Sequence, residues 1–494
     1  MGALRCRPLA GWQLQMPAPK SIADAYANHL LRDLGAGLPE PVMGNTVDAA
    51  LAWADSGLMF LCGELNQPPR QGPGAIPSCA RGVVSAIRLL APQTLSSDID
   101  GAYLLSERAA MLGLRARGSM SPNQSCRLLP SLDGWLALNL ARGEDWLSMA
   151  AWLQADKPID NWDSVRQVVA QRHTDELVER GRLLGLPLAA ANANTKTAKS
   201  WFRLQQRGLQ RPPPAASTVP LVIDLSSLWA GPLCSHLLQQ AGARVIKVES
   251  LQRPDGARPD GVPPSGVPPG GVPPDEARPD ASQIDHAGYS DFYHLLNAGK
   301  SSVALDFSRP AGVRQLQALL RHADIVIEGS RPRALQQLGI DAEAIVQSKP
   351  GLVWLGISGY GRRQPEANWV AFGDDAAMAA GIANTGARSP LFVGDALADP
   401  LCGVHAALLA LACWRAGEGA LLDISLYDVA AHCLAYAPSI VQGDVVAACG
   451  QQWQFAVAGH STEIRKPQAR RPLQLAARLG ADTRTVLREF AIPC

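Results

Sequence analysis

Apolar positions in the first hundred residues recur at the spacing of a helix. Three Ala- and Leu-rich stretches show this spacing: 22–36, 46–63 and 78–91. A Pro-, Gly- and Gln-rich sequence at 66–77 separates the last two. The pattern therefore predicts three helices joined by loops in this part of the chain.

Residues 126–142 carry a different pattern, in which two apolar runs flank Asp133-Gly134. This dipeptide favours the tight turn of a hairpin, so we expect two antiparallel strands here. Helical spacing returns at 143–154 and at 161–185. The sequence thus predicts that 111–202 form a small α+β domain.

From residue 219 onward, short apolar runs alternate with helical stretches of about a dozen residues. The runs that we predict as strands lie within 219–227, 243–250, 301–307, 324–330, 350–361 and 420–425. Further Ala-rich helices are expected at 374–383 and 402–416, and another follows the last strand up to 437. Such alternation predicts an α/β fold with an open, doubly wound parallel sheet, a Rossmann-like large domain beside the smaller α+β domain.

Two Pro-rich stretches interrupt these patterns. Residues 203–218 are polar and rich in Pro, and we interpret them as a linker between domains. Residues 253–283 contain near-repeats of Gly-Val-Pro-Pro and too few large apolar side chains to build a core. We therefore expect 253–283 to be a mobile surface insertion in the large domain, which spans 219–437.

Charge and cysteine content narrow the classes of function. The 494 residues include 45 basic and 44 acidic side chains, a formal net charge of +1, so neither nucleic acid nor an anionic membrane is expected as partner. No apolar run is long enough for a membrane span, and the N-terminus does not have the pattern of a signal peptide. The ten cysteines form no C-x-x-C motif and no zinc-type cluster. A cytoplasmic protein without a bound metal is the expectation.

A polar, Pro-containing turn leads directly into an Ala- and Leu-rich helix at 394–412. Asp399 lies at the start of this helix, where N–H groups and the helix dipole stabilise a carboxylate, and Gly403 follows one turn later. Taken alone, the pattern is more typical of an Asp that caps a helix than of a catalytic residue. The surrounding motifs change this interpretation.

The second half of the chain resembles the class III CoA-transferases, the family of formyl-CoA transferase and the carnitine CoA-transferases. The resemblance rests on an ordered series of motifs: D-L-S-S-L-W-A-G-P (224–232), G-A-R-V-I-K-V-E (242–249), N-A-G-K-S-S-V-A-L-D (297–306), V-I-E-G-S-R-P (326–332), L-G-I (338–340), I-S-G-Y-G (357–361), A-D-P-L-C-G (398–403) and L-L-D-I-S-L-Y-D (421–428). Each motif alone is weak, but their order is specific. The segments 126–138 and 470–489 are also similar to the family's small domain and closing segment.

The resemblance implies an open α/β fold, usually in an interlocked homodimer, that moves CoA from an acyl-CoA donor to a carboxylic acid acceptor. It places the nucleophilic aspartate of the family at Asp399, which would form covalent acyl and CoA-thioester intermediates. Helix N–H groups near Gly403 would stabilise the developing oxyanions. The expected partners are an acyl-CoA and a small carboxylate, with CoA thioester as substrate and with no permanently bound cofactor and no metal.

Further binding residues follow from matching motif positions. Ala230, Gly231 and Pro232 form a strand–helix turn that would let a ligand approach closely, with a purely structural turn as the alternative. Lys300 and Arg331 are candidates for the CoA phosphates, with solvated surface charge as the alternative.

The chain departs from the family's pattern at several positions. The departures are Gly329-Ser330 in place of the Asn-Phe before the arginine, Ala298 in place of an arginine, and only Gly118 near the expected glycine-rich loop. A further acidic pair, Asp374 and Asp375, is a candidate second carboxylate pair, but we favour the interpretation as solvated charges at the start of a helix.

The chain also repeats itself. H-L-L-x-x-x-G-A occurs at 29–36 and again at 236–243, and the helix at 81–91 resembles that at 402–412. We therefore expect 1–110 to be a shortened, degenerate copy of the large domain, in which Ser78 stands where the other copy has Asp399. Residues 438–494 would be the closing segment. Such a duplication could replace one subunit of the dimer, so a homodimer and a monomer both remain open.

Three other functions compete with CoA transfer. A racemase of the same fold needs a histidine opposite the aspartate, but Phe372 stands at that position, and His405 lies deep in the Asp399 helix. A nicotinamide dehydrogenase would use Glu249 at the end of the second strand, but its turn lacks G-x-G-x-x-G. A non-catalytic CoA-binding protein or partner subunit is the third alternative.

Overall fold

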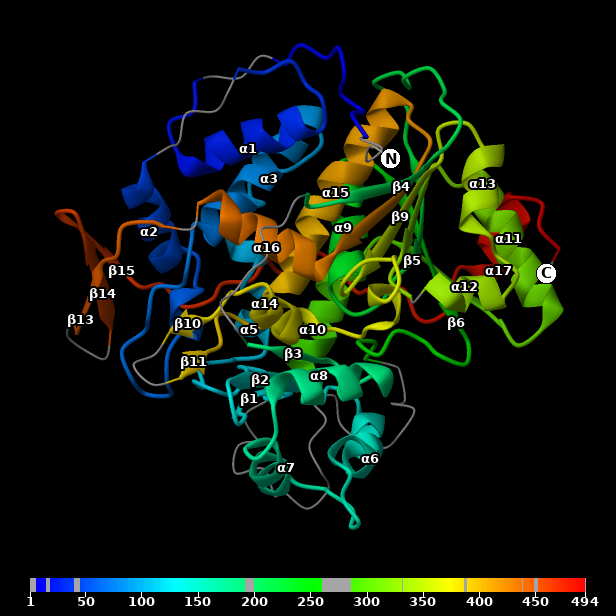
Figure 1. Cartoon of the computed structure of the whole chain (residues 1–494). Helices are drawn as coiled ribbons and strands as arrows, with labels where there is room; N and C mark the ends of the chain where they lie inside the picture. The colour runs from blue at the N-terminus through cyan, green and yellow to red at the C-terminus, as the bar shows by residue number, and fades with distance from the viewer. Residues whose placement is uncertain are drawn as a thin grey trace.

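The computed structural model describes residues 6–14, 18–39, 45–191, 200–259, 286–330, 332–385, 389–437, 439–447 and 452–493. Figure 1 shows these residues as one body, with a central sheet, a layer of helices on each side and a small domain below. None of the described helices has both the length and the apolar character needed to cross a bilayer.

The central sheet has seven strands in the order β4-β12-β9-β8-β5-β6-β7. Their bounds are β4 (Arg203–Arg207), β5 (Leu221–Leu225), β6 (Arg244–Ser250), β7 (Ser301–Leu305), β8 (Ile325–Glu328), β9 (Val353–Ser358) and β12 (Ala420–Ser425). All neighbours pair in parallel except β4, which is antiparallel to β12. The predicted α/β fold with an open parallel sheet is confirmed.

Neighbouring residues of one strand point into two different cores, as expected for a sheet covered on both faces. On β5, Val222 belongs to the core that includes helices α9 (Ala230–Gln240) and α15 (Ala398–Ala416), whereas Ile223 belongs to the core that includes α11 (Pro310–His322). Other helices around this sheet are α10 (His286–Asn297), α12 (Pro332–Gln337), α13 (Ala342–Ser348), α14 (Gly373–Ala379), α16 (Leu426–Tyr436) and α17 (Thr483–Glu489). Figure 1 shows α11, α13 and α17 on the side of the sheet opposite to α9 and α15.

The described residues before 126 form helices without a strand. These are α1 (Ile22–Asp33), α2 (Thr46–Asp55), the 3-10 turn Met59–Leu61, α3 (Ile76–Leu90), α4 (Gly101–Leu104) and α5 (Glu107–Met111). The three predicted helices are confirmed, although the second ends at Asp55 because Gly57 adopts a positive φ of 77°. The apolar faces of α1 and α3 belong to the same core as α9 and α15.

The small domain is built around an antiparallel sheet with its own core. The predicted hairpin is confirmed as β1 (Cys126–Pro130) and β2 (Trp135–Asn139), and β3 (Leu188–Ala190) pairs with β2. Its helices are α6 (Met149–Leu153), α7 (Trp162–Val169) and α8 (Thr174–Leu183), and the 3-10 helix Gly143–Ser148 precedes them. The stretch 161–185, predicted as one run of helical spacing, thus forms two helices.

Two helix pairs pack through the same kind of contact. A Cβ atom added to Gly82 of α3 would lie 2.5 Å from the carbonyl oxygen of Ala23, and one added to Gly403 of α15 would lie 2.7 Å from that of Ala230. Ala23 precedes His29 by six residues, as Ala230 precedes His236 in the repeated motif. Glycine is required at both positions because the backbones of the paired helices touch there.

Both Pro-rich predictions need correction. The stretch 203–218 begins as strand β4, which pairs with β12 at the edge of the main sheet, so its first residues are not linker. Residues 253–259 of the predicted insertion are anchored, because Asp255 and Arg258 are buried. The Gly-Val-Pro-Pro repeats lie outside the described residues.

The segment after 437 crosses both halves of the molecule. It holds β13 (Asp444–Ala447), β14 (Trp453–Val457) and β15 (His460–Glu463), which form an antiparallel sheet. The backbone N–H of Arg465 then donates to Ala54 in α2, and the N–H of Asp482 donates to Ser302 in β7. A two-stranded pair, β10 (Asn384–Thr385) with β11 (Pro390–Leu391), lies between α14 and α15 in the chain.

Candidate functional site

Asp399 is in the first turn of α15, as predicted from the sequence. The turn that leads into the helix contains Gly394 with φ 73° and Ala396 with φ 42°. A positive φ is uncommon at a residue other than Gly, and such strain is held only where the surroundings fix it. Here the N–H of Ala396 donates to Asp374 at 2.7 Å, and the carbonyl of Ala396 accepts from the N–H of Asp399 at 2.9 Å. The turn therefore fixes the point at which Asp399 leaves the backbone.

The start of a second helix, α14, faces the Asp399 side chain. The N–H of Gly373, the first residue of α14, donates to Asp399 Oδ2 at 3.2 Å. A Cβ atom at position 373 would lie 2.6 Å from that oxygen and 2.2 Å from the carbonyl oxygen of Ala396. Only glycine lets the two helix starts approach this closely, and both helix dipoles then favour negative charge at the carboxylate.

Four carboxyl groups gather around these two helix starts. They belong to Asp374, Asp375, Asp395 and Asp399. The first three are almost fully buried, with exposed fractions of 3%, 0% and 0%, whereas Asp399 is partly exposed. Our expectation that Asp374 and Asp375 are solvated is therefore wrong.

The first half of the chain supplies the side chains that hold the buried carboxylates. Arg108 of α5 binds Asp395 through two hydrogen bonds, of 2.7 and 2.8 Å, and its guanidinium lies 4.4 Å from the centre of the Trp229 ring. Asn123 donates to Asp374 and to Asp395, both at 2.9 Å. Asn139 of β2 donates to Asp375 at 3.1 Å. Residues far apart in the sequence thus build one polar cluster.

Burial controls the protonation of this cluster. Removal from water raises the pKa of Asp399 to about 7, although Arg108 acts in the opposite direction, and Asp374 raises the pKa further. Burial also raises the pKa of Asp374 to about 6 and that of Asp375 to about 8. Near neutral pH, Asp375 is mostly protonated and Asp399 is divided between its two forms.

Four members of this site are not predicted from the sequence: Arg108, Asn123, Asn139 and Asp395. They lie up to 291 positions from Asp399, in parts of the chain without a local motif. For Asp395 a signal was present, because it belongs to the same turn as Asp399. For the other three, only the packing of the small domain and α5 against α14 and α15 brings the side chains into place.

The glycine and proline candidates have structural partners instead of an open surface. Gly231 lies against Ser226, whose Oγ would be 2.1 Å from an added Cβ. Gly403 accommodates the Ala230 carbonyl, and the carbonyl of Pro232 accepts from Lys300 at 3.1 Å. The four predicted positions, Ala230, Gly231, Pro232 and Gly403, are all buried. At 230–232, where close approach of a ligand was inferred, the close contacts are therefore between α9, α15 and the end of β5.

Lys300 is not placed to bind a phosphate, contrary to the prediction. Its side chain is buried, and its ammonium contacts four oxygens, of Asp224, Pro232, Ser235 and Asn297, at 2.7–3.3 Å. Burial lowers the pKa of Lys300 to about 8, although Asp224 opposes this change. Burial would raise the pKa of Asp224, but Lys300 and Lys247 together lower it to about 2. The ion pair closes the space between β5 and α9.

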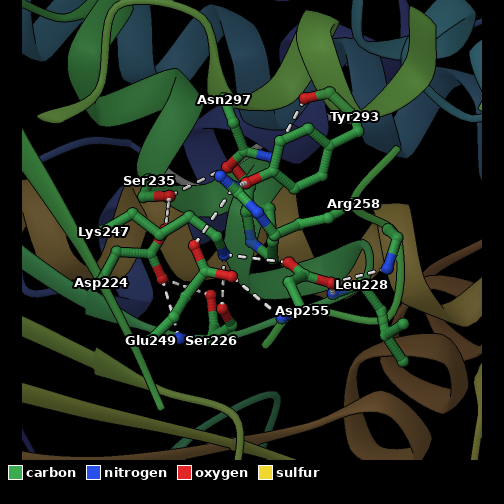
Figure 2. Close-up of polar contacts among 12 residues, drawn as sticks. Asp224, Ser226, Leu228, Ser235, Lys247, Glu249, Asp255, Arg258, Tyr293 and Asn297 are labelled. Carbon is green, nitrogen blue, oxygen red and sulfur yellow. Dashed lines mark hydrogen bonds and ion pairs between the residues drawn. The ribbon is translucent and has the colours of Figure 1, made fainter. Parts of the chain in front are cut away.

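A second buried ion pair continues this network and is visible in Figure 2. Lys247 of β6 lies 3.0 Å from Asp255 and donates to the carbonyl of Ser226 at 2.7 Å. Asp255 in turn accepts from the N–H of Leu228 at 3.0 Å. Glu249 accepts from Arg258 at 3.4 Å. Charges from β6 thus anchor residues 255–258, which the sequence placed in a mobile insertion.

The remaining residues considered in the sequence are Arg331, His405, Phe372 and Gly118. Arg331 lies outside the described residues. His405 is fully buried, as expected from its place deep in the Asp399 helix. Its Nδ1 lies 2.7 Å from the Leu401 carbonyl and its Nε2 2.8 Å from the Tyr26 hydroxyl. Phe372 directly precedes α14. The carbonyl of Gly118 accepts a hydrogen bond from the N–H of Phe392.

Comparison with known proteins identifies the region that contains Asp399. Residues 220–454 match the family model described as CoA-transferase family III. The chain is 31% identical over 226 residues to succinyl-CoA–D-citramalate CoA-transferase of Chloroflexus aurantiacus, which covers 44% of this chain and 51% of that protein. It is 29% identical over 214 residues to formyl-CoA:oxalate CoA-transferase of Escherichia coli, covering 42% of this chain and 46% of that protein. The chain spans about half the length of the curated relatives it matches.

Among solved structures, a CAIB/BAIF family protein from Brucella suis is 25% identical, with a TM-score of 0.39 over 49% of this chain and 65% of that one. The family match includes β5 to β9, both helix starts at the carboxylate cluster, and Asp399 itself. Residues 220–454 are therefore homologous to CoA-transferase family III.

Proposed function

We propose that the protein transfers CoA from an acyl-CoA donor to a carboxylic acid acceptor through covalent intermediates on Asp399. Homology of 220–454 to this family supports the class of reaction, and the carboxylate cluster supports the residue. The relatives act on CoA thioesters of small acids, such as succinyl-CoA and formyl-CoA according to their names. A short-chain acyl-CoA is accordingly the first donor to test.

One observation carries the choice of Asp399 over its neighbours. Of the four clustered carboxylates, Asp374, Asp375 and Asp395 are buried and each accepts at least one side-chain hydrogen bond. Asp399 is partly exposed, and the hydrogen bond that its carboxylate receives among the described residues comes from the N–H of Gly373. A nucleophile needs a reachable oxygen, and Asp399 is the residue of the cluster that is not fully buried.

The proposed cycle keeps the acyl group activated at each step. The Asp399 carboxylate attacks the thioester carbonyl, the C–S bond breaks, and CoA leaves as thiolate while the acyl group and Asp399 form a mixed anhydride. The thiolate then attacks the aspartyl carbonyl, which releases the donor acid and forms an aspartyl-CoA thioester. The acceptor carboxylate attacks this thioester and displaces the thiolate. The thiolate finally attacks the acceptor carbonyl, which forms the new acyl-CoA and returns Asp399.

The residues around Asp399 have separate tasks in this cycle. The Gly373 N–H orients one carboxylate oxygen, so the other is directed toward the substrate. The positive charge of Arg108 lowers the pKa of Asp399 against the effects of burial and of Asp374, which favours the ionised nucleophile. Arg108 also compensates Asp395, a fully buried charge.

The alternatives receive less support. Phe372 stands where a racemase would need a histidine, directly before Gly373, whose N–H donates to Asp399. The absence of matches for the family's Asn-Phe and glycine-rich motifs would suit a non-catalytic CoA-binding member. The partly exposed Asp399 with an intact supporting cluster favours the enzyme.

A transfer assay separates these functions. Purified protein is incubated with succinyl-, formyl- or acetyl-CoA and a panel of carboxylic acids, and new acyl-CoA is measured by mass spectrometry. We expect transfer by the wild type and none by Asp399→Asn, with CoA binding retained. Replacement of the exposed Asp98 by Asn is the matched control. Binding without transfer for every donor and acceptor would favour the non-catalytic alternative.

We further propose that 1–110 arose as a shortened copy of the large domain and takes the place of a second subunit. The repeated motif and the matching Gly82–Ala23 and Gly403–Ala230 contacts support this origin. Ser78 is then the counterpart of Asp399, so one site remains for each chain. Light scattering of the purified protein should give the mass of one chain, whereas a stable dimer would contradict the replacement.

A further inference from the structure

A second cluster of polar side chains joins α1 to α16 and has no part in the proposed reaction. His29 and Asp33 lie one turn apart on α1, with Nε2 and Oδ2 separated by 3.6 Å. His432 of α16 lies against them, and the rings of His29 and His432 are nearly parallel, with their centres 5.4 Å apart. One ligand atom from each of these three residues lies within 4.8 Å of the others.

The environment of His432 requires an explanation. Its Nε2 atom is buried and has no hydrogen-bond partner among the described residues, and a buried polar atom of this kind costs about 1–3 kcal/mol. An imidazole nitrogen without a hydrogen-bond partner has a lone pair or a proton left unused, and a bound metal ion would satisfy it.

We infer that His29, Asp33 and His432 form a binding site for a divalent transition-metal ion, of which Zn²⁺ is the first to test. Two imidazoles and one carboxylate are ligands that Zn²⁺ accepts, with metal–ligand distances near 2.0–2.1 Å. Ligands around a tetrahedral ion at that distance stand about 3.4 Å apart. The 3.6 Å between His29 and Asp33 is close to this value, and the ligand atom of His432 lies within 4.8 Å of both, so metal binding would draw the His432 ring toward the other two.

Neighbouring groups support the site from behind. Trp201 Nε1 donates to Asp33 Oδ2 at 3.3 Å, which orients the carboxylate as the outer partners of metal ligands commonly do. The side chains of His29 and Asp33 are 31% and 39% exposed, which leaves a route for the ion and a position for water as fourth ligand. The sequence did not reveal this group, because His432 is about 400 positions from its partners.

The site lies away from the carboxylate cluster. Tyr26 packs against His432, and its hydroxyl lies 2.8 Å from Nε2 of His405. His405 is six residues after Asp399, or about 9 Å along α15. A metal ion would therefore tie the N-terminal helices to the CoA-transferase region without contacting the reacting groups. The inference does not rest on CoA transfer, and the two can be tested separately.

The test uses the full-length chain without an affinity tag, freed of metal by chelator and dialysis. Zn²⁺ is titrated in competition with a chromogenic chelator, and Co²⁺ absorption in the visible range reports the coordination. We expect one equivalent of ion, an affinity at least tenfold lower for His29→Ala and for Asp33→Asn, and a higher melting temperature with Zn²⁺ in the wild type only. Circular dichroism confirms that each variant is folded.

A second His–carboxylate pair provides the matched control. His173 lies 3.0 Å from Asp133 in the small domain and belongs to no group of three ligands among the described residues. His173→Ala should bind Zn²⁺ like the wild type. The inference is overturned if the wild type shows no saturable site, if the α1 variants bind as tightly as the wild type, or if His173→Ala abolishes binding.

Discussion

The backbone N–H of Gly373 donates a hydrogen bond of 3.2 Å to Oδ2 of Asp399, which joins the first turns of α14 and α15. The contact exists because position 373 has no side chain. It orients a partly exposed carboxylate at two helix N-termini, where negative charge is favoured. The nucleophile proposed for the reaction thus depends on a neighbour that contributes only its backbone.

Gly373→Ala should impair both this contact and the fold around it. The added Cβ would lie 2.2 Å from the Ala396 carbonyl oxygen, so the backbone must shift, at a cost of about 1–3 kcal/mol. We expect CoA transfer to fall at least tenfold and the urea midpoint to decrease. Gly256→Ala is the control, since its nearest contact would be an ordinary 3.8 Å. Full activity in Gly373→Ala would show that the contact does not orient Asp399.

Arg108→Ala should change the pH dependence of the reaction. Without this cation the pKa of Asp399 rises above about 7, so less of the nucleophile is ionised at neutral pH. We expect the acidic limb of the kcat/KM profile to move to higher pH, and stability to fall by about 3–5 kcal/mol because Asp395 is left buried and unpaired. Arg108→Lys should have a pH profile and a stability between those of the wild type and of Arg108→Ala.

Arg142→Ala controls for the loss of a buried ion pair elsewhere. Arg142 pairs with the buried Asp145 in the small domain, at 2.5 Å. This variant should lose stability but keep the wild-type pH profile. An unchanged profile in Arg108→Ala would contradict the electrostatic role that we assign to Arg108.

Asp375 should make the protein less stable as the pH rises. In the unfolded chain this group ionises near pH 4, whereas in the folded protein burial raises its pKa to about 8. The folded state therefore binds more protons between these pH values, so the free energy of unfolding decreases with pH over that range. The pKa values of Asp374 and Asp399 are also raised in the folded protein, so these groups likewise lower the free energy of unfolding as the pH rises.

Asp375→Asn removes this titration and keeps an oxygen for Asn139 and Phe372. We expect a flatter dependence of unfolding free energy on pH, with a gain on the order of 1–3 kcal/mol at pH 8 over the wild type. Urea titrations from pH 5 to 8 measure this dependence. Asp98→Asn, at an exposed position, should keep the wild-type slope of unfolding free energy against pH. A slope unchanged in Asp375→Asn would mean that the group is ionised in the folded protein.

Lys300→Met tests the structural role of this lysine. Removal of its ammonium leaves Asp224 with Lys247 as the remaining nearby cation, so we expect a loss of about 3–5 kcal/mol of stability. Where the variant is still folded, its KM for acyl-CoA should stay within about twofold of the wild type. Lys157→Met, at an exposed position, is the control. A large rise in KM without loss of stability would restore the phosphate-binding role.

Local patterns predicted much of this protein, because short-range rules govern them. The alternation of strands and helices after 219 gave the parallel sheet, and Asp133-Gly134 gave the hairpin. The Pro-rich composition of 203–218 and 253–283 was misleading, since pairing of β4 with β12 and the ion pair of Asp255 with Lys247 fix parts of both. Long-range partners override composition at these positions.

Some residues of the candidate site could likewise be predicted from local sequence, and others could not. Asp399 could be placed from its motif and helix start, whereas Arg108 and Asn123 depend on how distant parts of the chain pack. Burial could not be predicted from the sequence either, so Asp374 was expected to be solvated, and Lys300 was expected to bind CoA phosphates or to be solvated. Charged residues are usually exposed, and their burial here follows from partners that only the fold brings together.

The most direct measurement is the trapping of the covalent intermediate. The protein is mixed with each acyl-CoA of the panel and quenched with hydroxylamine, and the modified residue is located by peptide mass spectrometry. Our account predicts a hydroxamate on Asp399 with at least one donor, and none in Asp399→Asn. A hydroxamate on another carboxylate, or acyl transfer without any adduct, would contradict it.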